Sequence, residues 1–310
     1  MAKGSSSRIR RLLAVPAALV VAGACAGLAG CSAGGDGGGR PVVASSTAGR
    51  SVPSAATETP AKRTQSPTPA QTTPAAPSPA AAPAADGPLK GKVVVVDPGH
   101  NIRNQDHPAE INRQVDIGTG HKECDTTGTS TDSGYPEATF SLDVAHRLRA
   151  ILLARGASVV LTHDDDRPYG PCVDERAGIG NRAHGDAAVS VHADGAGVGD
   201  RGFHVILPAE VHAGRADTSP IVGPSKELGA RIAGNFVRTT GSAPSNYIGK
   251  GTGLDTRGDL GGLNLSTIPK VFIECGNMRD PKDAALLMDA DWREKAAQGI
   301  ADGITDFLRG

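Results

Sequence analysis

The chain has 310 residues and a formal net charge of −1 at pH 7, with 21% charged residues. This near balance of charge excludes the strongly basic surface through which a protein attracts nucleic acid, so no nucleic-acid partner is expected. Only some of the residues have the composition of a globular protein, so the folded domain is predicted to be shorter than the chain.

The first residues have the pattern of an export signal. A basic head, MAKGSSSRIRR, precedes the apolar, small-residue stretch LLAVPAALVVAGACAGLAG. This stretch runs into LAGC at residues 28–31, which looks like a lipobox, where cleavage occurs just before a lipid-carrying cysteine. We therefore predict a lipoprotein-type signal over residues 1–31, with the lipid on Cys31. The alternative is an ordinary secreted protein; a transmembrane anchor fits less well because small residues dominate the stretch.

Residues 32–88 are dominated by Gly, Ser, Thr, Pro and Ala, as in TQSPTPAQTTPAAPSPAAAPAADGP. Such a segment buries too little apolar surface to offset the entropy that is lost on ordering. Its prolines favour an extended tether, and we predict a disordered linker here. The composition becomes globular after Pro88, which leaves residues 89–310 as a single folded domain.

Three apolar strands each carry a titratable side chain at or near their carboxyl end. KVVVVDPGHN leads through a turn to His100, DAAVSVHADG contains His192, and IPKVFIECGNM contains Glu274. Helix-like segments separate the strands, which predicts an α/β domain with a mostly parallel twisted sheet flanked by helices. Because parallel strands bring their carboxyl ends to one edge of the sheet, we expect these side chains to lie close together there.

A helix is predicted in GYPEATFSLDVAHRLRAILLARG, where Pro136 suits the first helical position and Gly156 suits the C-terminal stop. Glu137 heads a line of apolar residues at helical spacing. A carboxylate on such a buried line is costly unless a cation neutralises it. A capping role at the helix N-terminus is the alternative, but we predict a metal ligand. The apolar residues on the line are Phe140, Val144, Leu148 and Ile151.

Two imidazoles and one carboxylate are a common ligand set for catalytic zinc, with the fourth position left to water. His100, Glu137 and His192 supply this set, which predicts one Zn²⁺ per domain. Zinc lowers the pKa of its bound water to about 7. A second carboxylate, Glu274, is the candidate that accepts the proton of this water and passes it to the leaving amine. The predicted chemistry is hydrolysis of an amide. Asp97 is expected to hold the turn before His100 or to support that histidine.

Other candidate ligands fit less well. His107 and His121 lie in a loop without an apolar period, and His204 lies inside a strand-like run. The acidic run at residues 164–166 lacks the spaced oxygen ligands of a calcium loop, and we interpret it as a solvated turn.

Three cysteines fall in the predicted domain. Cys124 and Cys172 lie in loop-like surroundings rich in Gly, Pro and Asp, whereas Cys275 follows an apolar strand. In an exported protein, pairing of two such cysteines is favoured. We predict a Cys124–Cys172 disulfide and a buried Cys275 thiol, with three free thiols as the alternative.

With these motifs the sequence resembles the zinc-dependent N-acetylmuramoyl-L-alanine amidases of the type 3 family. The resemblance runs from about residue 92 to 308 and implies zinc on His100, Glu137 and His192 and a catalytic carboxylate at Glu274. It also implies cleavage of the amide between N-acetylmuramic acid and the L-alanine of the peptidoglycan stem peptide. The matching motifs, in order, are VVVDPGH, PEATFSLDVAHRL, THDDDR with DERAGIGNRA, SVHADG, RGFHVIL and IPKVFIECGNM.

Two segments depart from the family pattern. NIRNQDHPAEINRQVDIGTGHKEC, after His100, is longer and more polar than in many members, so no substrate contact from this loop is carried over. Some members block their site with an inserted helix, but the corresponding PAEVHAGRADTSPIVGPS is broken by Pro and Gly. We expect no strong helix in this segment and an ungated site.

Two other functions remain open. A zinc peptidase that cuts within the stem or cross-bridge peptides would use the same ligands, and a non-enzymatic wall-binding module would keep only a degenerate site. Glu274 argues against the second, because a binding module has no use for a positioned base. The expected location is the cell envelope, with a lipid anchor as the only membrane contact, on the outer face of the membrane; a secreted or periplasmic protein is the alternative.

Overall fold

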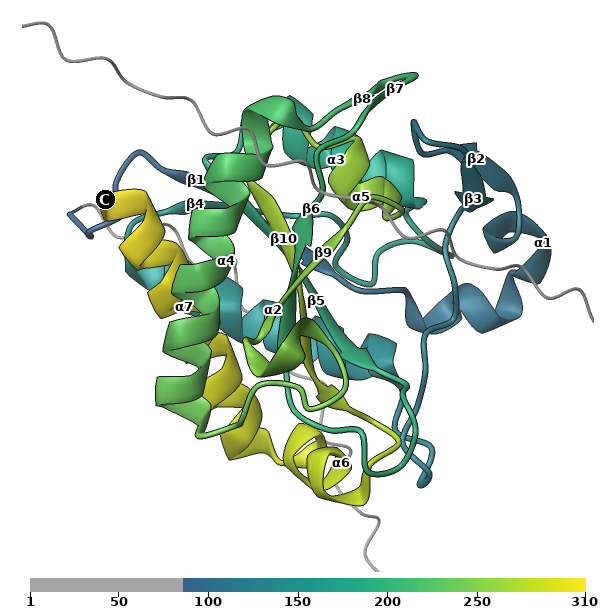
Figure 1. Ribbon diagram of the computed structural model, residues 1–310, viewed down its shortest axis with the longest axis vertical. Helices are drawn as coiled ribbons and strands as arrows, with labels where there is room; N and C mark the ends of the chain where they lie inside the picture. The colour runs from purple at the N-terminus through teal and green to yellow at the C-terminus, as the bar shows by residue number, and fades with distance from the viewer. Residues whose placement is uncertain (1–85) are drawn as a thin grey trace, which may run out of the picture. The chain divides into compact units, whose positions relative to one another are not determined.

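The computed structural model describes residues 86–310; the predicted signal, Cys31 and nearly all of the predicted linker lie outside the described residues. One sheet of six strands runs through this part of the chain in the order β4-β1-β5-β10-β6-β9 (Figure 1). Neighbouring strands are parallel except β10 and β6, which confirms the predicted mostly parallel sheet. The strands are β1 (Val93–Pro98), β4 (Ser158–Leu161), β5 (Ala187–Asp194), β6 (His204–Pro208), β9 (Leu254–Arg257) and β10 (Lys270–Asn277).

Helices cover both faces of the sheet, and each face has its own apolar core. The larger core joins α2, α4 and α7 to one face, and α4 and α7 run side by side (Figure 1). The smaller core lies on the other face, near the end of α3. None of the helices described for residues 86–310 has the length and apolar character needed to cross a membrane. The long helices are α2 (Glu137–Ala154), α3 (Val173–Arg182), α4 (Ser219–Thr240) and α7 (Ala290–Arg309).

Short elements connect these layers. Two small hairpins, β2–β3 and β7–β8, stand apart from the main sheet. They are formed by β2 (Gln114–Asp116), β3 (His121–Glu123), β7 (His212–Ala213) and β8 (Ala216–Asp217). The short helices are η1 (Ile102–Asp106), α1 (Pro108–Ile111), η2 (Gly249–Gly251), α5 (Gly261–Asn264) and α6 (Pro281–Met288).

The helix predicted between Pro136 and Gly156 is α2, and its limits follow the predicted signals. Pro136 is the N-cap residue, one position before the helix, and Gly156 has a φ of 91°, a conformation that favours glycine. Glu137 is buried at the first helical position. The apolar line behind it is in the larger core, with Phe140, Val144 and Leu148 fully buried and Ile151 partly buried.

The expectation of no strong helix within PAEVHAGRADTSPIVGPS is wrong for its second half. The 22-residue helix α4 begins at Ser219, inside this segment. Pro220 lies in the first turn, where its missing N–H needs no partner, and Pro224 follows only one turn later. Buried residues further along, such as Leu228 and Ile232, pack the helix into the larger core and compensate for the second proline.

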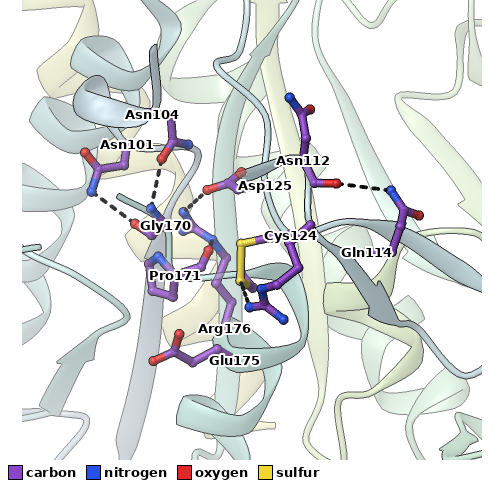
Figure 2. Close-up of a disulfide and its surroundings, with 12 residues drawn as sticks. Asn101, Asn104, Asn112, Gln114, Cys124, Asp125, Gly170, Pro171, Glu175 and Arg176 are labelled. Carbon is purple, nitrogen blue, oxygen red and sulfur yellow. Dashed lines mark hydrogen bonds and ion pairs between the residues drawn. A yellow bond between two sulfur atoms is a disulfide. The ribbon is translucent and has the colours of Figure 1, made fainter. Parts of the chain in front are cut away.

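The predicted disulfide is present and Cys275 is a buried free thiol. The Cys124–Cys172 bond joins the loop after β3 to the residue that precedes α3, across a sequence separation of 48 (Figure 2). Both cysteines pack with Val115 and Ile117 in a small separate apolar cluster. The bond therefore fixes the long polar loop after β1 to the main body of the domain.

We expect the double substitution C124A/C172A to lower the free energy of unfolding by about 2–4 kcal/mol, because the bond closes a loop of about 50 residues in the unfolded chain. Denaturant titration of the variant and of the wild type checks this value. Wild-type protein in excess reductant should shift to the same midpoint as the variant. Identical midpoints with and without reductant would show that the bond contributes nothing to stability.

Candidate metal centre and active site

The three predicted ligands come together at the carboxyl edge of the sheet. Glu137 Oε1 lies 3.1 Å from His100 Nε2 and 2.9 Å from His192 Nδ1. The two imidazole rings are edge-on, with centroids 4.9 Å apart. One ligand atom from each of the three residues lies within 4.8 Å of the other two, and all three side chains are largely buried. Such a cluster of two nitrogens and a carboxylate oxygen fits a small divalent cation such as zinc.

The turn after β1 sets the direction of His100. His100 has a φ of 61°, in the left-handed region that a residue with a side chain seldom adopts. The preceding Gly99 packs against the second imidazole, and a Cβ at this position would lie 2.4 Å from the His192 ring. The Gly99 N–H donates to the Val191 carbonyl at 2.9 Å, which ties the turn to β5. Only glycine fits at position 99 without moving a candidate ligand.

The carboxylate of Glu137 is held from several sides. Its Oε2 accepts the Thr129 N–H at 2.9 Å, and its Oε1 accepts the Ala193 N–H at 3.3 Å. Burial on its own would raise the pKa of Glu137, but His100 and His192 outweigh burial and hold that pKa well below its usual range. With a metal bound, the two imidazoles would be neutral and Glu137 would supply the anionic charge of the ligand set.

Glu274 lies on β10, in register with His192 on β5. It lines a cleft of about 260 Å³ together with all three candidate ligands. Its Oε2 is buried and has no hydrogen-bond partner among the described residues. Burial raises the pKa of Glu274, and the neighbouring carboxylates Glu137 and Asp194 raise it further. A buried carboxylate oxygen without a partner is costly, and a water or a substrate group in the cleft would satisfy it.

A buried ion-pair network lies behind His100. Asp97 is fully buried, and its carboxylate accepts hydrogen bonds from Arg176 at 2.8 Å and from Lys270 at 3.2 Å. Arg176 also donates to the His100 carbonyl at 2.9 Å. Its bond to the Asp125 carboxylate, at 2.9 Å, is drawn in Figure 2. Asp97 thus holds the turn as predicted, and it supports His100 only indirectly, through the Arg176 guanidinium.

Asp125 completes the network from the side of the disulfide. Its Oδ1 lies 3.6 Å from His100 Nδ1, and the Thr126 carbonyl lies 3.1 Å from the same nitrogen. Asp125 directly follows Cys124, so the disulfide fixes the loop that contacts the candidate ligand (Figure 2). Sequence reasoning did not find Asp125, Arg176 or Lys270. A lysine inside the apolar run IPKVFIE was a usable signal, because a buried cation in a strand requires an anionic partner.

The remaining candidates lie outside the cluster. His107 contacts Glu110, and His204 is buried on β6. In the acidic run, Asp164 pairs with His146, and the run forms a turn rather than a metal loop. Among the described residues, the group that could hold a metal ion is His100, Glu137 and His192, as predicted.

Comparison with known proteins decides the family. Residues 94–306 match the sequence family described as N-acetylmuramoyl-L-alanine amidase. The chain belongs to this amidase family. It is 44% identical over 222 residues to the N-acetylmuramoyl-L-alanine amidase Rv3717 of Mycobacterium tuberculosis, a match that covers 71% of this chain and 88% of that protein.

Solved amidase structures have the same fold. The N-acetylmuramyl-L-alanine amidase Ami1 from Mycobacterium smegmatis is 41% identical, with a TM-score of 0.66, and the match covers 71% of this chain and 98% of that one. The apo form of Ami1 from Mycobacterium abscessus is 40% identical, with a TM-score of 0.65, and the match covers 71% of this chain and 100% of that one. The family and the fold predicted from the sequence motifs are confirmed.

We expect D97N to lower the free energy of unfolding at pH 7 by about 3–5 kcal/mol, because it leaves buried Arg176 and Lys270 without their shared anion. Burial raises the pKa of Asp97, but the two cations outweigh burial and hold it far below the usual range. The stabilisation by Asp97 is therefore complete above the unfolded-state pKa of about 3.9, and it decreases progressively as the pH falls from there toward the much lower folded-state pKa. Urea unfolding of both proteins from pH 7 to pH 3 should show the difference narrowing with acidity. A difference that does not change with pH would contradict this ionised role of Asp97.

Proposed function

We propose that this protein hydrolyses the amide between N-acetylmuramic acid and the L-alanine of the peptidoglycan stem peptide, and that the reaction requires zinc. Membership of the amidase family supports this function. The observation that carries it is the unpartnered Glu274 carboxylate, which faces the same cleft as three converging metal-ligand side chains. A binding module would have no reason to keep such a carboxylate buried and unsatisfied.

His100, Glu137 and His192 would hold the zinc ion, with an imidazole nitrogen, a carboxylate oxygen and a second imidazole nitrogen. When bound, zinc supplies Lewis-acid polarisation of a carbonyl and lowers the pKa of a water molecule. Glu137 contributes the anionic charge, and the Thr129 N–H keeps its second oxygen from turning away from the cluster. Asp125 and the Thr126 carbonyl face His100 Nδ1, which leaves Nε2 directed at Glu137 and the site.

Glu274 would act as the proton carrier. Its carboxylate accepts a proton from the attacking water and donates that proton to the amide nitrogen as the carbon–nitrogen bond breaks. The products are the free lactyl carboxyl group on the sugar and a peptide with a free alanine amino group. Its Oε2 is buried in the wall of the cleft, which shields this oxygen from bulk water.

The placement of the enzyme follows from its substrate. Peptidoglycan lies outside the cytoplasmic membrane, so we propose export by the signal over residues 1–31 and lipid attachment at Cys31. The Pro-rich linker over residues 32–88 would then tether the catalytic domain, residues 89–310, to the outer face of the membrane. Sequence pattern alone supports this part of the proposal, because these segments fall almost entirely outside the described residues.

Product analysis tests the proposed reaction. Purified protein should release stem peptides with a free N-terminal alanine from peptidoglycan and leave the glycan strands intact, as identified by mass spectrometry. Chelator should abolish the release, and added zinc should restore it. Fragments cut inside the stem or the cross-bridge would identify a peptidase instead, and absence of any zinc-dependent product would refute the enzymatic function.

We expect E274Q to lower turnover by about 100- to 10,000-fold and to retain zinc, because glutamine fills the same space but cannot accept the proton. Elemental analysis of the dialysed variant and peptide release from purified peptidoglycan are the two measurements. Zinc retention with wild-type activity would place the proton carrier elsewhere. Loss of zinc together with activity would mean that Glu274 is itself a ligand.

A further inference from the structure

We propose that Arg257 binds the α-carboxylate of the second residue of the stem peptide, so that the enzyme prefers stems in which this group is free to stems in which it is an amide. This inference rests on the proposed function and concerns the substrate class that the same site selects. It follows from the position of Arg257, from its partners and from the charges around it.

Arg257 lies at the carboxyl end of β9, at the edge of the sheet, and lines the cleft that contains Glu274 and the candidate ligands. Among the described residues that line this cleft, it is the sole lysine or arginine. Two of the acidic residues of the cleft have other partners, whereas Glu274 has none among the described residues. Glu137 contacts the two histidines, and Asp194 accepts hydrogen bonds from the Tyr247 hydroxyl at 2.7 Å and from the Gly195 N–H at 2.6 Å.

Asp259 holds the Arg257 guanidinium from one side. Arg257 Nε donates to Asp259 Oδ1 at 2.9 Å, and Arg257 Nη2 donates to Asp259 Oδ2 at 2.6 Å. Arg257 Nη1 has no hydrogen-bond partner within residues 86–310, and the side chain is 38% exposed. This fork fixes the orientation of the guanidinium and leaves donors free for a second anion.

The cluster around Asp259 also carries an excess of positive charge. Lys122 Nζ donates to Asp259 Oδ2 at 3.0 Å, so one carboxylate is shared by two cations. Lys122 lines a neighbouring recess of about 230 Å³, and Leu260 lines both the recess and the cleft. The carboxylates of Asp255 and Glu274 also act on Arg257 and offset this excess. What Arg257 offers to an anionic substrate group is therefore the free edge of its guanidinium.

The stem peptide offers such a group at a suitable distance. The scissile amide belongs to the first residue, and a peptide chain advances at most about 3.5 Å per residue. A carboxylate on the second residue therefore lies only one residue beyond the bond that is cut, within reach of a side chain lining the same cleft. A guanidinium with a free edge binds a carboxylate more strongly than the amide that replaces it.

The test compares two soluble substrates that differ in one group: N-acetylmuramoyl-L-alanyl-D-glutamate, and its analogue in which the α-carboxylate is an amide. Both keep the side-chain carboxylate, so only the α-group changes. We expect the wild-type zinc enzyme to cleave the free acid with a kcat/KM about tenfold higher, mainly through a lower KM. R257Q should lose this preference, because it should lose about tenfold more activity on the acid than on the amide. R257K should recover part of the preference, because it keeps the charge without the fork.

A matched control is R231Q on α4, where an exposed arginine pairs with Glu227. This variant should keep the wild-type preference. Equal cleavage of the two substrates by the wild type, or an equal loss on both substrates in R257Q, would overturn the role of Arg257 while leaving the amidase function intact. If neither substrate releases peptide, whereas peptides cut within the stem are hydrolysed, the proposed function itself fails.

Discussion

The position of one buried carboxylate, Glu137 between His100 and His192, is the constraint on which the site depends. A carboxylate buried on a core-facing helix line would be expelled or protonated unless cations or donors surround it. The fold meets this requirement by placing one imidazole just after β1 and one near the end of β5, and by starting α2 at the same edge of the sheet. Each of the three elements brings one side chain, and none of them alone could form the cluster.

Keeping His100 in place requires a second layer of buried charge. Its left-handed backbone is unfavourable, and Arg176 binds its carbonyl while being held by Asp97 and Asp125. The disulfide adjoins Asp125, and Lys270 adjoins Asp97 from the strand that carries Glu274. The network therefore connects β1, α3, β10 and the loop that follows β1. The charged side chains behind His100 are buried because each of them has a partner in this network. Its cost in desolvation is offset by nearly complete pairing.

Sequence patterns were sufficient for the elements whose signals are local. These signals depend only on neighbours within a few residues. They are the strand ends near His100, His192 and Glu274, the apolar line behind Glu137 and the residues around the cysteines. Helix α4 was missed because its prolines are tolerated only through tertiary packing of its later turns. The Asp97–Arg176 and Lys122–Asp259 pairs join residues 79 and 137 positions apart, and no local pattern specifies such contacts.

The most direct test of this account is a crystal structure of the zinc-loaded protein with diffraction data collected at the zinc absorption edge. The account predicts one anomalous peak in the domain, bonded to His100, Glu137 and His192 at about 2.0–2.2 Å. The Glu274 carboxylate should face this peak without being bonded to it. A peak at any other group of residues, or one in which Glu274 replaces Glu137 as the third protein ligand, would contradict the account.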